Sequence, residues 1–354
     1  MIHGPVLVTG AGGFIGGRIV EVLHAMGVCD VRAGLRRWSS GAQVGRLPVD
    51  LVACDVLDAA TVEAAAAGCT AIVHCAVGDR RTTIEGTRHV LEAAQRAGVG
   101  RVVHLSTIDV YGRATGRVTE DAPFTATGVE YGDAKIEAEQ LCRRARAAGM
   151  PVTVLRPTIV YGPHSQLWTI EFAERLRRGA WLLSEADTSG TCNLVYVDDL
   201  VQAVVRALDA PAPVNDDFNI NGPDRPTWHA YFGALSAAMG LGPLKAASRG
   251  TSHLVAQAMA PVRMAAKWTL KRYPGLVMGV YQRSAVAKRL MKGAEAAIRQ
   301  SPTQGEFLLY GRVADFPTDK AAAHLAYRPR FSMADGIDLS VRWLRHHGYL
   351  GSSR

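Results

Sequence analysis

The sequence predicts an α/β protein built on a doubly wound parallel sheet, with a smaller, helix-rich C-terminal lobe. Over the first 160 residues, short apolar runs alternate with stretches that are compatible with helices. The apolar runs are mostly too continuous for strands with one exposed face, which indicates strands covered by helices on both sides. The first run also leads directly into a glycine-rich turn and then a helix, the start of a nucleotide-binding βαβ unit.

The expected elements follow in a regular order. Strands are expected at Val6–Thr9, Val31–Leu35, Leu51–Ala53, Ala71–Cys75, Val102–Ser106 and Val152–Arg156. Helices are expected between them at Ile15–Ala25, Ala59–Ala66, Thr83–Ala97 and Ala134–Ala148. After residue 163 the alternation ends, and the remaining expected elements are a helix at Thr169–Arg178, a strand at Cys192–Val197, and helices at Asp199–Leu208 and Met333–Arg345.

The composition is that of an ordinary globular protein. The chain has 354 residues, of which 48% are hydrophobic and 20% charged. The first strand-like run begins almost at Met1, so we expect no secretory signal peptide, and no run approaches the ~20 apolar residues that cross a bilayer. Six cysteines without C-x-x-C spacing are interpreted as free, mostly buried thiols in a reducing cytoplasm, and no metal site is expected.

The net charge of +8 is concentrated in one segment, residues 241–300, which carries eleven basic residues against the single acid Glu295. This basic insert therefore has a net charge of +10. It predicts a phosphate-bearing ligand or contact with an anionic surface, and a solvated helical face is the alternative. The basic residues are Lys245, Arg249, Arg263, Lys267, Lys271, Arg272, Arg283, Lys288, Arg289, Lys292 and Arg299.

Apolar residues are interleaved with these charges. They include Leu254, Met264, Trp268, Leu276 and Val280. A basic arm that binds nucleic acid would lack such residues, so the pattern predicts amphipathic helices packed on a core and no nucleic-acid partner.

A nucleotide-binding signature, Thr9-Gly10-Ala11-Gly12-Gly13-Phe14-Ile15-Gly16, lies between the first expected strand and the first helix. Glycines at 10, 13 and 16 permit a tight turn, close approach of the backbone to a pyrophosphate, and close helix–strand packing. The N–H groups at the start of the helix then bind phosphate. This pattern predicts a Rossmann-type domain at 1–165, to which 191–212 returns. The segments 166–190 and 213–354 are expected to form the substrate-binding lobe.

The end of the second expected strand bears on the choice between NAD and NADP. An NAD site usually has an acid there, which binds the ribose 2′-hydroxyl. This strand instead ends in Leu35-Arg36-Arg37, and Asp30 lies at its opposite end. Because Arg binds a 2′-phosphate bidentately, NADP is the expected cofactor, with NAD also possible. Alternatively, Arg36 and Arg37 stack on adenine or face solvent.

Tyr131 and Lys135 stand four residues apart, on one face of an expected helix. A phenol with a pKa near 10 is a poor acid or base at neutral pH. A nearby ammonium and a cationic nicotinamide favour the phenolate, so we expect the pKa of Tyr131 to be brought towards neutrality. Lys135 can also hold the nicotinamide ribose.

Together these elements resemble the extended short-chain dehydrogenase/reductase family, of the NAD-dependent epimerase/dehydratase type, over nearly the whole chain. Seven elements carry the resemblance in order: Thr9–Gly16 (T-G-x-x-G-x-x-G), Asp55-Val56, His74-Cys75-Ala76 (H-x-A), Ser106–Gly112 (S-S-x-x-V-Y-G), Tyr131 with Lys135 (Y-x-x-x-K), Arg156–Pro163 (R-P-x-x-V-Y-G-P) and Val197–Asp199 (V-D-D).

This resemblance implies roles for particular residues. Thr107 stands where the family's hydroxyl hydrogen-bonds the reacting oxygen, so the expected catalytic residues are Thr107, Tyr131 and Lys135. Asp55 stands where the family's acid contacts adenine. The expected cofactor-binding residues are Gly10, Gly12, Gly13, Phe14, Ile15, Gly16, Arg36, Arg37, Asp55, Val56, Cys75, Ala76, Lys135 and Pro157.

Two departures from the family pattern touch the expected substrate side. Thr83 stands where the family has Asn in its N-V-x-G-T element, and the preceding loop, Val77–Thr82, is unusually short. Both changes weaken any transfer of substrate identity from the family.

Two substrate classes stay open, and the enzyme is expected to be a homodimer in either case. Nucleotide sugars dominate the family and suit the basic insert, and Trp168 or Trp228 is suited to stack on them. However, the family's diphosphate-gripping R-x-G-D element is missing. A lipophilic ketone or alcohol is the alternative, because Asp319–Ala321 and Leu325–Pro329 resemble the tail of 3β-hydroxysteroid dehydrogenases. A non-catalytic NADP sensor is disfavoured, since it would be expected to lack Tyr131 or Lys135.

Overall fold

The computed structural model describes residues 4–179, 182–244, 247–273 and 301–350, together with the single positions 275, 278, 288, 289, 291, 293, 294 and 298. The chain forms two compact units. The first comprises Met1–Trp168, Asn193–Asp224 and Ala314–Gly336. The second comprises Thr169–Cys192, Arg225–Val313 and Ile337–Arg354.

The first unit is built on a seven-stranded sheet in the order β10-β7-β5-β4-β1-β2-β3, and every neighbouring pair is parallel. The order reverses beside β1, as expected for a doubly wound sheet. The predicted fold class is therefore confirmed. The strands are β1 (Val6–Thr9), β2 (Val31–Leu35), β3 (Asp50–Ala53), β4 (Ala71–His74), β5 (Arg101–Leu105), β7 (Val152–Pro157) and β10 (Asp217–Ile220).

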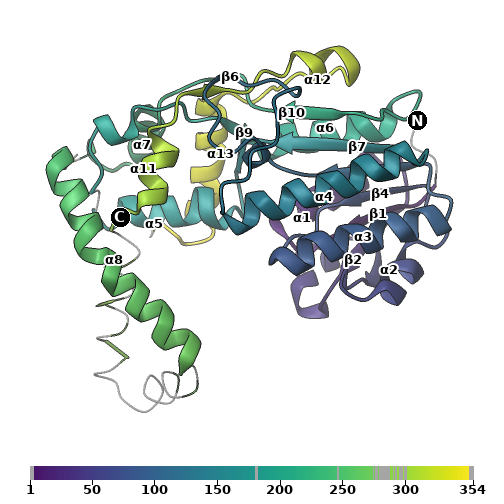
Figure 1. Cartoon of the computed structure of the whole chain (residues 1–354), viewed down its shortest axis with the longest axis horizontal. Coiled ribbons are helices and arrows are strands. Elements are labelled where there is room, and N and C mark those ends of the chain that lie inside the picture. Colours follow the sequence, from purple (N-terminus) through teal and green to yellow (C-terminus); the bar gives the residue numbers. More distant parts are fainter. Residues whose placement is uncertain are drawn as a thin grey trace. The chain divides into compact units, whose positions relative to one another are not determined.

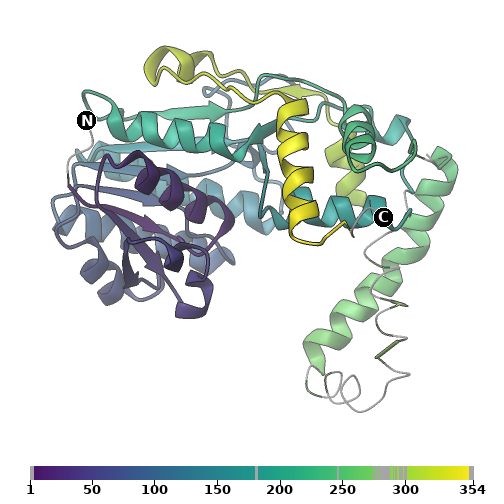
Figure 2. The same ribbon diagram turned by 180° about the vertical axis from the view of Figure 1, so that it is seen from behind.

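Helices cover both faces of this sheet (Figures 1 and 2). One face carries α2 (Ala59–Ala66), α3 (Arg80–Arg96) and α4 (Glu130–Ala147), and the other carries α1 (Phe14–Met26) and α6 (Val197–Asp209). Under α2–α4, Ile72, Val102 and Val154 of adjacent strands are buried in one core with Val90 and Cys142 of the helices. This packing excludes water from both faces of the central strands, which explains their continuous apolar runs.

The expected helices are confirmed, but α3 and α4 begin earlier than expected. Asp79 caps α3, because its carboxylate accepts the N–H of Thr82 at 2.8 Å. Before α4, the carboxylate of Asp133 accepts the N–H groups of Thr127 and Gly128 at 2.9 and 3.0 Å. The first bond satisfies a backbone donor at the start of α3, and the other two hold the preceding loop against the first turn of α4, which contains Tyr131.

Residues 213–224 and 314–336 belong to the sheet-containing unit, not to the lobe in which the sequence analysis had placed them. The physical reason is strand pairing. β10 pairs with β7 at the edge of the main sheet, and β11 (Ala314–Asp315) pairs with β6 (Gly116–Arg117). A second small pair joins β8 (Ile159–Tyr161) to β9 (Leu194–Tyr196).

The second unit is helical and has an aromatic core. Phe172, Trp228 and Phe232 pack edge-on or stacked, with ring centres 5.0–6.3 Å apart, and Tyr310 lies 4.6 Å from Trp228. Its helices are α5 (Glu171–Arg177), α7 (Trp228–Ala238), α8 (Arg249–Arg272), α11 (Gln304–Tyr310) and the later part of α13 (Met333–His346). Another helix, α12 (Asp319–His324), belongs to the first unit.

In the described part of the chain, no helix is long and apolar enough to cross a membrane. All six cysteines are unpaired, and four of them are buried.

Candidate active site

The glycine-rich turn forms a cradle that side chains would fill. Gly10 has φ +68°, and a Cβ there would stand 2.8 Å from the backbone N of Ala76. A Cβ on Gly12 would stand 2.6 Å from the carbonyl oxygen of Ser40, and one on Gly16 would collide with the carbonyl of Gly10. α1 begins after Gly13 with no side chain capping its first N–H groups. The cradle therefore fits a pyrophosphate bound by backbone N–H groups.

The other residues expected to bind the cofactor follow neighbouring strands at the same edge of the sheet. Arg36 and Arg37 follow β2, Asp55 and Val56 follow β3 after one residue, and Cys75 with Ala76 directly follows β4. Pro157 ends β7. Because the strands are parallel, their carboxyl ends share one edge, where ligands bind in sheets of this kind. The structure thus brings these residues to the edge that carries the glycine cradle.

Arg36 and Arg37 are exposed, and among the described residues their guanidinium groups make no hydrogen bond or ion pair. No acid follows β2 to compete for them. Asp55 is engaged locally, since its carboxylate accepts the N–H of Leu57 at 3.0 Å. Among the described residues, Arg36 interacts only electrostatically, with Asp79, and both guanidinium groups are exposed and free to bind an anion.

His74 at the end of β4 ties the cradle to α3. Its Nδ1 lies 2.7 Å from the hydroxyl of Thr9, and its Nε2 lies 3.2 Å from the hydroxyl of Thr87. Thr87 donates its own proton to the carbonyl of Thr83 at 2.7 Å, so it accepts a proton from Nε2, and Thr9 donates to Nδ1. Burial, and secondarily Lys135, lower the pKa of His74 to about 3. A neutral imidazole thus holds β1, β4 and α3 together.

Thr107, Tyr131 and Lys135 lie where β5 meets the start of α4. Thr107 follows β5 after one residue, and its hydroxyl accepts the N–H of Asp109 at 3.2 Å. Tyr131 is hydrogen-bonded to Thr107. Lys135, one helical turn further along α4, is buried and donates from Nζ to the carbonyl of Leu105 at 2.7 Å. The three residues expected to be catalytic are thus brought together at the carboxyl end of β5.

The pKa of Tyr131 differs from the expectation. Desolvation of the phenol, reinforced by Asp109, raises its pKa to about 12, although the hydrogen bond with Thr107 acts in the opposite direction. Lys135 does not offset this, because its ammonium is turned to the carbonyl of Leu105. Burial lowers the pKa of Lys135 itself to about 8. At neutral pH the chain alone therefore presents a protonated phenol, 43% of whose residue surface is exposed.

A buried ionic network, which sequence reasoning did not single out, supports this site. Arg156 on β7 is fully buried and donates to Glu139 on α4 and to Asp217 on β10, with contacts of 2.6 Å to each. Glu139 also accepts the hydroxyl of Ser106. Burial opposes the charge of Arg156, but its hydrogen bonds to Glu139 outweigh that effect and raise its pKa.

This network adjoins the expected catalytic residues on both sides. Ser106 directly precedes Thr107, and Glu139 lies one turn beyond Lys135. Only the position of Arg156 within an apolar run hinted at a buried guanidinium that would need partners.

The basic insert is only partly described. Lys245, Arg283, Lys292 and Arg299 lie outside the described residues, as do the side chains of Lys267 and Lys271 and the apolar Leu276 and Val280. The expectation that its apolar residues pack on a core is wrong for Leu254, Met264 and Trp268, which are 61–69% exposed. The reason is that α8 turns a different face, which includes Ser252 and Ala256, towards its own unit.

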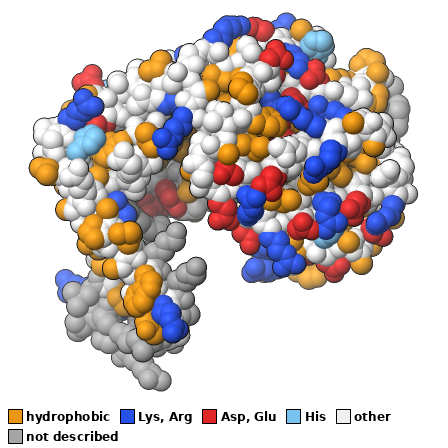
Figure 3. Space-filling model, viewed as in Figure 1, with side chains coloured by type: hydrophobic (Ala, Val, Ile, Leu, Met, Phe, Trp, Pro, Cys, Tyr) orange, Lys and Arg blue, Asp and Glu red, His pale blue; other side chains and the backbone are white. Residues whose placement is uncertain are grey.

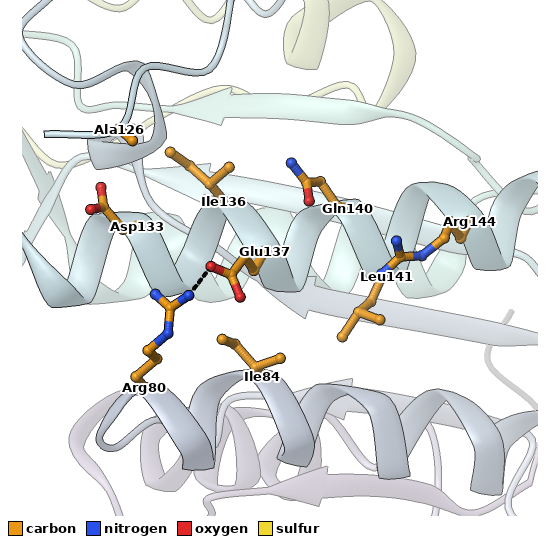
Figure 4. A pocket seen from close by; sticks show the side chains of 9 residues that line it. All are labelled: Arg80, Ile84, Ala126, Asp133, Ile136, Glu137, Gln140, Leu141 and Arg144. Carbon is orange, nitrogen blue, oxygen red and sulfur yellow. Dashed lines mark hydrogen bonds and ion pairs between the residues drawn. The ribbon is translucent and has the colours of Figure 1, made fainter. Parts of the chain in front are cut away.

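A surface hollow lies between the outer faces of α3 and α4 (Figure 4). Arg80 from α3 and Glu137 from α4 form an ion pair across it, with Ile84 and Ile136 beside them. None of the residues expected to bind cofactor or to act in catalysis lines this hollow. It is therefore separate from the site at the carboxyl edge of the sheet.

A doubly wound parallel sheet, a glycine cradle at its carboxyl edge and a Tyr–Lys pair define an NAD(P)-dependent enzyme of the extended short-chain dehydrogenase/reductase class. Residues 6–221 match the model of the NAD dependent epimerase/dehydratase family. The chain belongs to this family.

Relatives of the chain act on different substrates, as their names state. It is 31% identical to a 2-alkyl-3-oxoalkanoate reductase of Stenotrophomonas maltophilia, over 59% of this chain and 66% of that protein. It is 30% identical to human 3 beta-hydroxysteroid dehydrogenase type 7, over 57% and 62%, and 28% identical to UDP-glucose 4-epimerase of Vibrio cholerae, over 61% and 70%. These matches span about two thirds of the length of each relative.

Solved structures share the fold over nearly the whole chain. UDP-glucuronic acid 4-epimerase from Bacillus cereus, in complex with NAD, has a TM-score of 0.71 at 18% identity and covers 97% of this chain and 96% of its own. A dTDP-glucose 4,6-dehydratase from Streptomyces venezuelae, also with NAD, has a TM-score of 0.72 at 23% identity and covers 98% and 99%. At these identities the likeness shows the fold alone.

Proposed function

We propose that this protein is an NAD(P)-dependent oxidoreductase or epimerase that moves a hydride at a secondary alcohol or ketone, with Tyr131 as the proton-transfer group. The observation that carries the proposal is that Thr107, Tyr131 and Lys135 lie together at the carboxyl end of β5, with Tyr131 and Lys135 one turn apart on α4. The nicotinamide supplies or accepts the hydride when it is bound. The protein's residues then hold the reacting oxygen and move its proton.

The proton chemistry follows from the chain's own groups. The hydroxyls of Thr107 and Tyr131 both contact the carbonyl oxygen of a ketone. The phenol, which desolvation keeps protonated, donates its proton as the alcohol forms. Lys135, cationic below a pKa of about 8, stabilises the phenolate that remains once its ammonium turns from the carbonyl of Leu105 towards the ring. The protonation states at neutral pH thus favour reduction.

We further propose that the cofactor is NADP, with NAD as the alternative. Gly10, Gly12, Gly13, Phe14, Ile15 and Gly16 would hold the pyrophosphate, Asp55 and Val56 the adenine, and Cys75, Ala76, Lys135 and Pro157 the nicotinamide ribose side. Arg36 and Arg37 would bind the 2′-phosphate, since they lie beyond β2, are exposed, and make no hydrogen bond or ion pair with the residues that the structure describes.

For the substrate we propose a nucleotide sugar first, because the family contains many enzymes of these sugars and the solved structures named above act on them. A lipophilic ketone or alcohol is the second candidate. Two observations favour it: the names of the reductase and hydroxysteroid dehydrogenase relatives, and the exposed apolar face of α8 in the second unit. A homodimer in the cytoplasm stays a prediction in either case.

Replacement of Tyr131 tests the reaction. Tyr131→Phe removes the phenolic proton while keeping the ring, so turnover is expected to fall about 10²- to 10⁴-fold with cofactor affinity unchanged. Tyr349→Phe, which removes a similar hydroxyl from a partly exposed tyrosine, is the control. Oxidation of NADPH is followed with UDP- and dTDP-4-keto sugars and, separately, with 3-ketosteroids and 3-oxoalkanoates. Turnover of Tyr131→Phe within a fewfold of wild type would show that another group moves the proton.

A further inference from the structure

One side of α8 is apolar, exposed and free of acids. Leu254, Ala258, Pro261, Ala265 and Trp268 recur at spacings of four and three, so they form one stripe along a helix of 24 residues, about 36 Å long. All five are exposed. The sequence of α8 contains five basic residues and no Asp or Glu. An exposed stripe of this size is unusual on a surface that faces only water.

The opposite side of α8 anchors the helix to its own unit. Ser252 and Ala256 are buried, and the ring of His253 stacks on Phe307 with centres 4.3 Å apart. The guanidinium of Arg263 donates to the carbonyl and hydroxyl of Ser301 at 2.9 and 2.7 Å. The inner side is therefore occupied by the protein, and the outer side is fixed in its orientation towards solvent.

Hydrophobic and basic side chains lie together in the C-terminal half of α8 and at Tyr273, which directly follows it (Figure 3). Met264, Trp268 and Leu270 are 57–69% exposed. Trp268 and Tyr273 pack edge-on with ring centres 5.7 Å apart, and the guanidinium of Arg272 lies 5.3 Å from the Tyr273 ring centre. Trp and Tyr beside Arg, in a helix without acids, match the chemistry of the boundary between lipid headgroups and acyl chains.

We propose that the C-terminal half of α8 together with Tyr273, residues 261–273, binds the surface of an anionic lipid bilayer. Met264 and Trp268 enter the acyl boundary, while Arg272, which lies on the same side of the helix, meets the lipid phosphates. Charge complementarity supports this occupant, because the whole basic insert carries eleven cations and one acid. The proposal goes beyond the reaction and does not depend on the substrate.

Two other occupants fit the surface less well. Nucleic acid would use the cations, but it gives no reason to expose three large apolar side chains to water. A second copy of this chain would present the same basic face to itself, and a C2 interface that includes α8 would bring like charges together.

Vesicle binding by the full-length protein tests the proposal. We expect co-sedimentation with vesicles of equal phosphatidylglycerol and phosphatidylcholine, little with phosphatidylcholine alone, and weakening as salt rises. Met264→Ser with Trp268→Ser is expected to reduce affinity about tenfold or more. The control is Val313→Ser, because Val313 is as exposed as Trp268, at 61%, but lies outside α8 in the same unit. Arg272→Gln is compared with Arg249→Gln at the other end of the helix.

Three results would overturn the proposal. One is wild-type protein that stays in the supernatant with anionic vesicles. Another is equal small losses for Arg272→Gln and Arg249→Gln with none for the Met264/Trp268 variant, which would indicate general attraction to negative charge. The third is light scattering in which the Met264/Trp268 variant changes oligomeric state while vesicle binding is unaltered, which would make the face a protein interface. Thermal unfolding by circular dichroism checks that each variant is folded, and loss of vesicle binding with turnover intact separates this proposal from the proposed reaction.

Discussion

Two regions of this protein depart from the usual distribution of side chains, in opposite directions. Beneath the candidate active site, Arg156, Glu139 and Asp217 are charged and buried. On α8, Met264 and Trp268 are large, apolar and exposed. In the first region every charge finds a partner within a few ångströms. In the second, Met264 and Trp268 are 69% and 61% exposed, although Trp268 packs edge-on against the ring of Tyr273.

The contrast distinguishes side chains that stabilise the fold from side chains that bind something outside the protein. Buried charges with partners inside the protein serve the fold, since removal of one partner leaves the others desolvated. Exposed apolar groups with no partner inside the protein serve contact with something outside it. Substitutions in the first region should therefore change stability, and substitutions in the second should change binding.

The largest effect on stability is expected in the buried network. Arg156→Met keeps much of the volume but leaves the carboxylate of Glu139 without its guanidinium, so the free energy of unfolding should fall by about 3–5 kcal/mol in urea. The control is Arg178→Gln, which breaks a surface pair with Glu174 in the second unit and should cost at most about 0.5 kcal/mol. If both variants lose less than about 1 kcal/mol, the network does not hold the fold as argued.

Arg36 and Arg37 offer a further test of this comparison, because they are exposed charges that make no hydrogen bond or ion pair with the described residues. By the same reasoning they should matter for a ligand and not for stability. Arg36→Ala with Arg37→Ala should weaken NADPH binding about ten- to a hundredfold more than NADH binding, since a charge-assisted pair contributes ~1.5–3 kcal/mol. Arg46→Ala, which removes an exposed arginine paired with Glu21, is the control. Equal losses for both cofactors in titration calorimetry would contradict a 2′-phosphate site.

The part of this arrangement that local sequence determines was predictable. Apolar runs placed the strands, and the parallel order then put Gly10, Arg36, Cys75 and Thr107 at one edge without any knowledge of their contacts. The exposed Trp268 was not predictable, because periodicity shows which helix face is apolar but not whether another element covers it.

Contacts between residues far apart in the chain could not be predicted from the sequence either. The hydrogen bond between Thr9 and His74 joins residues 65 positions apart, and Asp217 reaches Arg156 across 61 positions. β11 pairs with β6 from nearly 200 residues away, over two residues only. A strand of two residues is too short to show a hydrophobic alternation in the sequence. For this reason the sequence did not predict that 314–336 belongs to the first unit.

The smallest effect concerns Lys135, a buried charge beneath the site that donates a hydrogen bond to the carbonyl of Leu105 and not to a carboxylate. Burial lowers its pKa from 10.5 to about 8, so between pH 8 and 10.5 the unfolded chain holds a proton that the folded chain has released. Stability therefore rises with pH in this window, by less than about 1.4 kcal/mol per pH unit, and the penalty for burying the ammonium is fully present below pH 8. Lys135→Met has no such proton. Urea unfolding of both proteins from pH 7 to 10 should thus show the free energy of unfolding of wild type rising relative to that of the variant. Titrating groups that both proteins share do not affect this difference. A constant or shrinking stability of wild type against Lys135→Met would mean that Lys135 keeps its proton throughout and is better paired than its single carbonyl contact indicates.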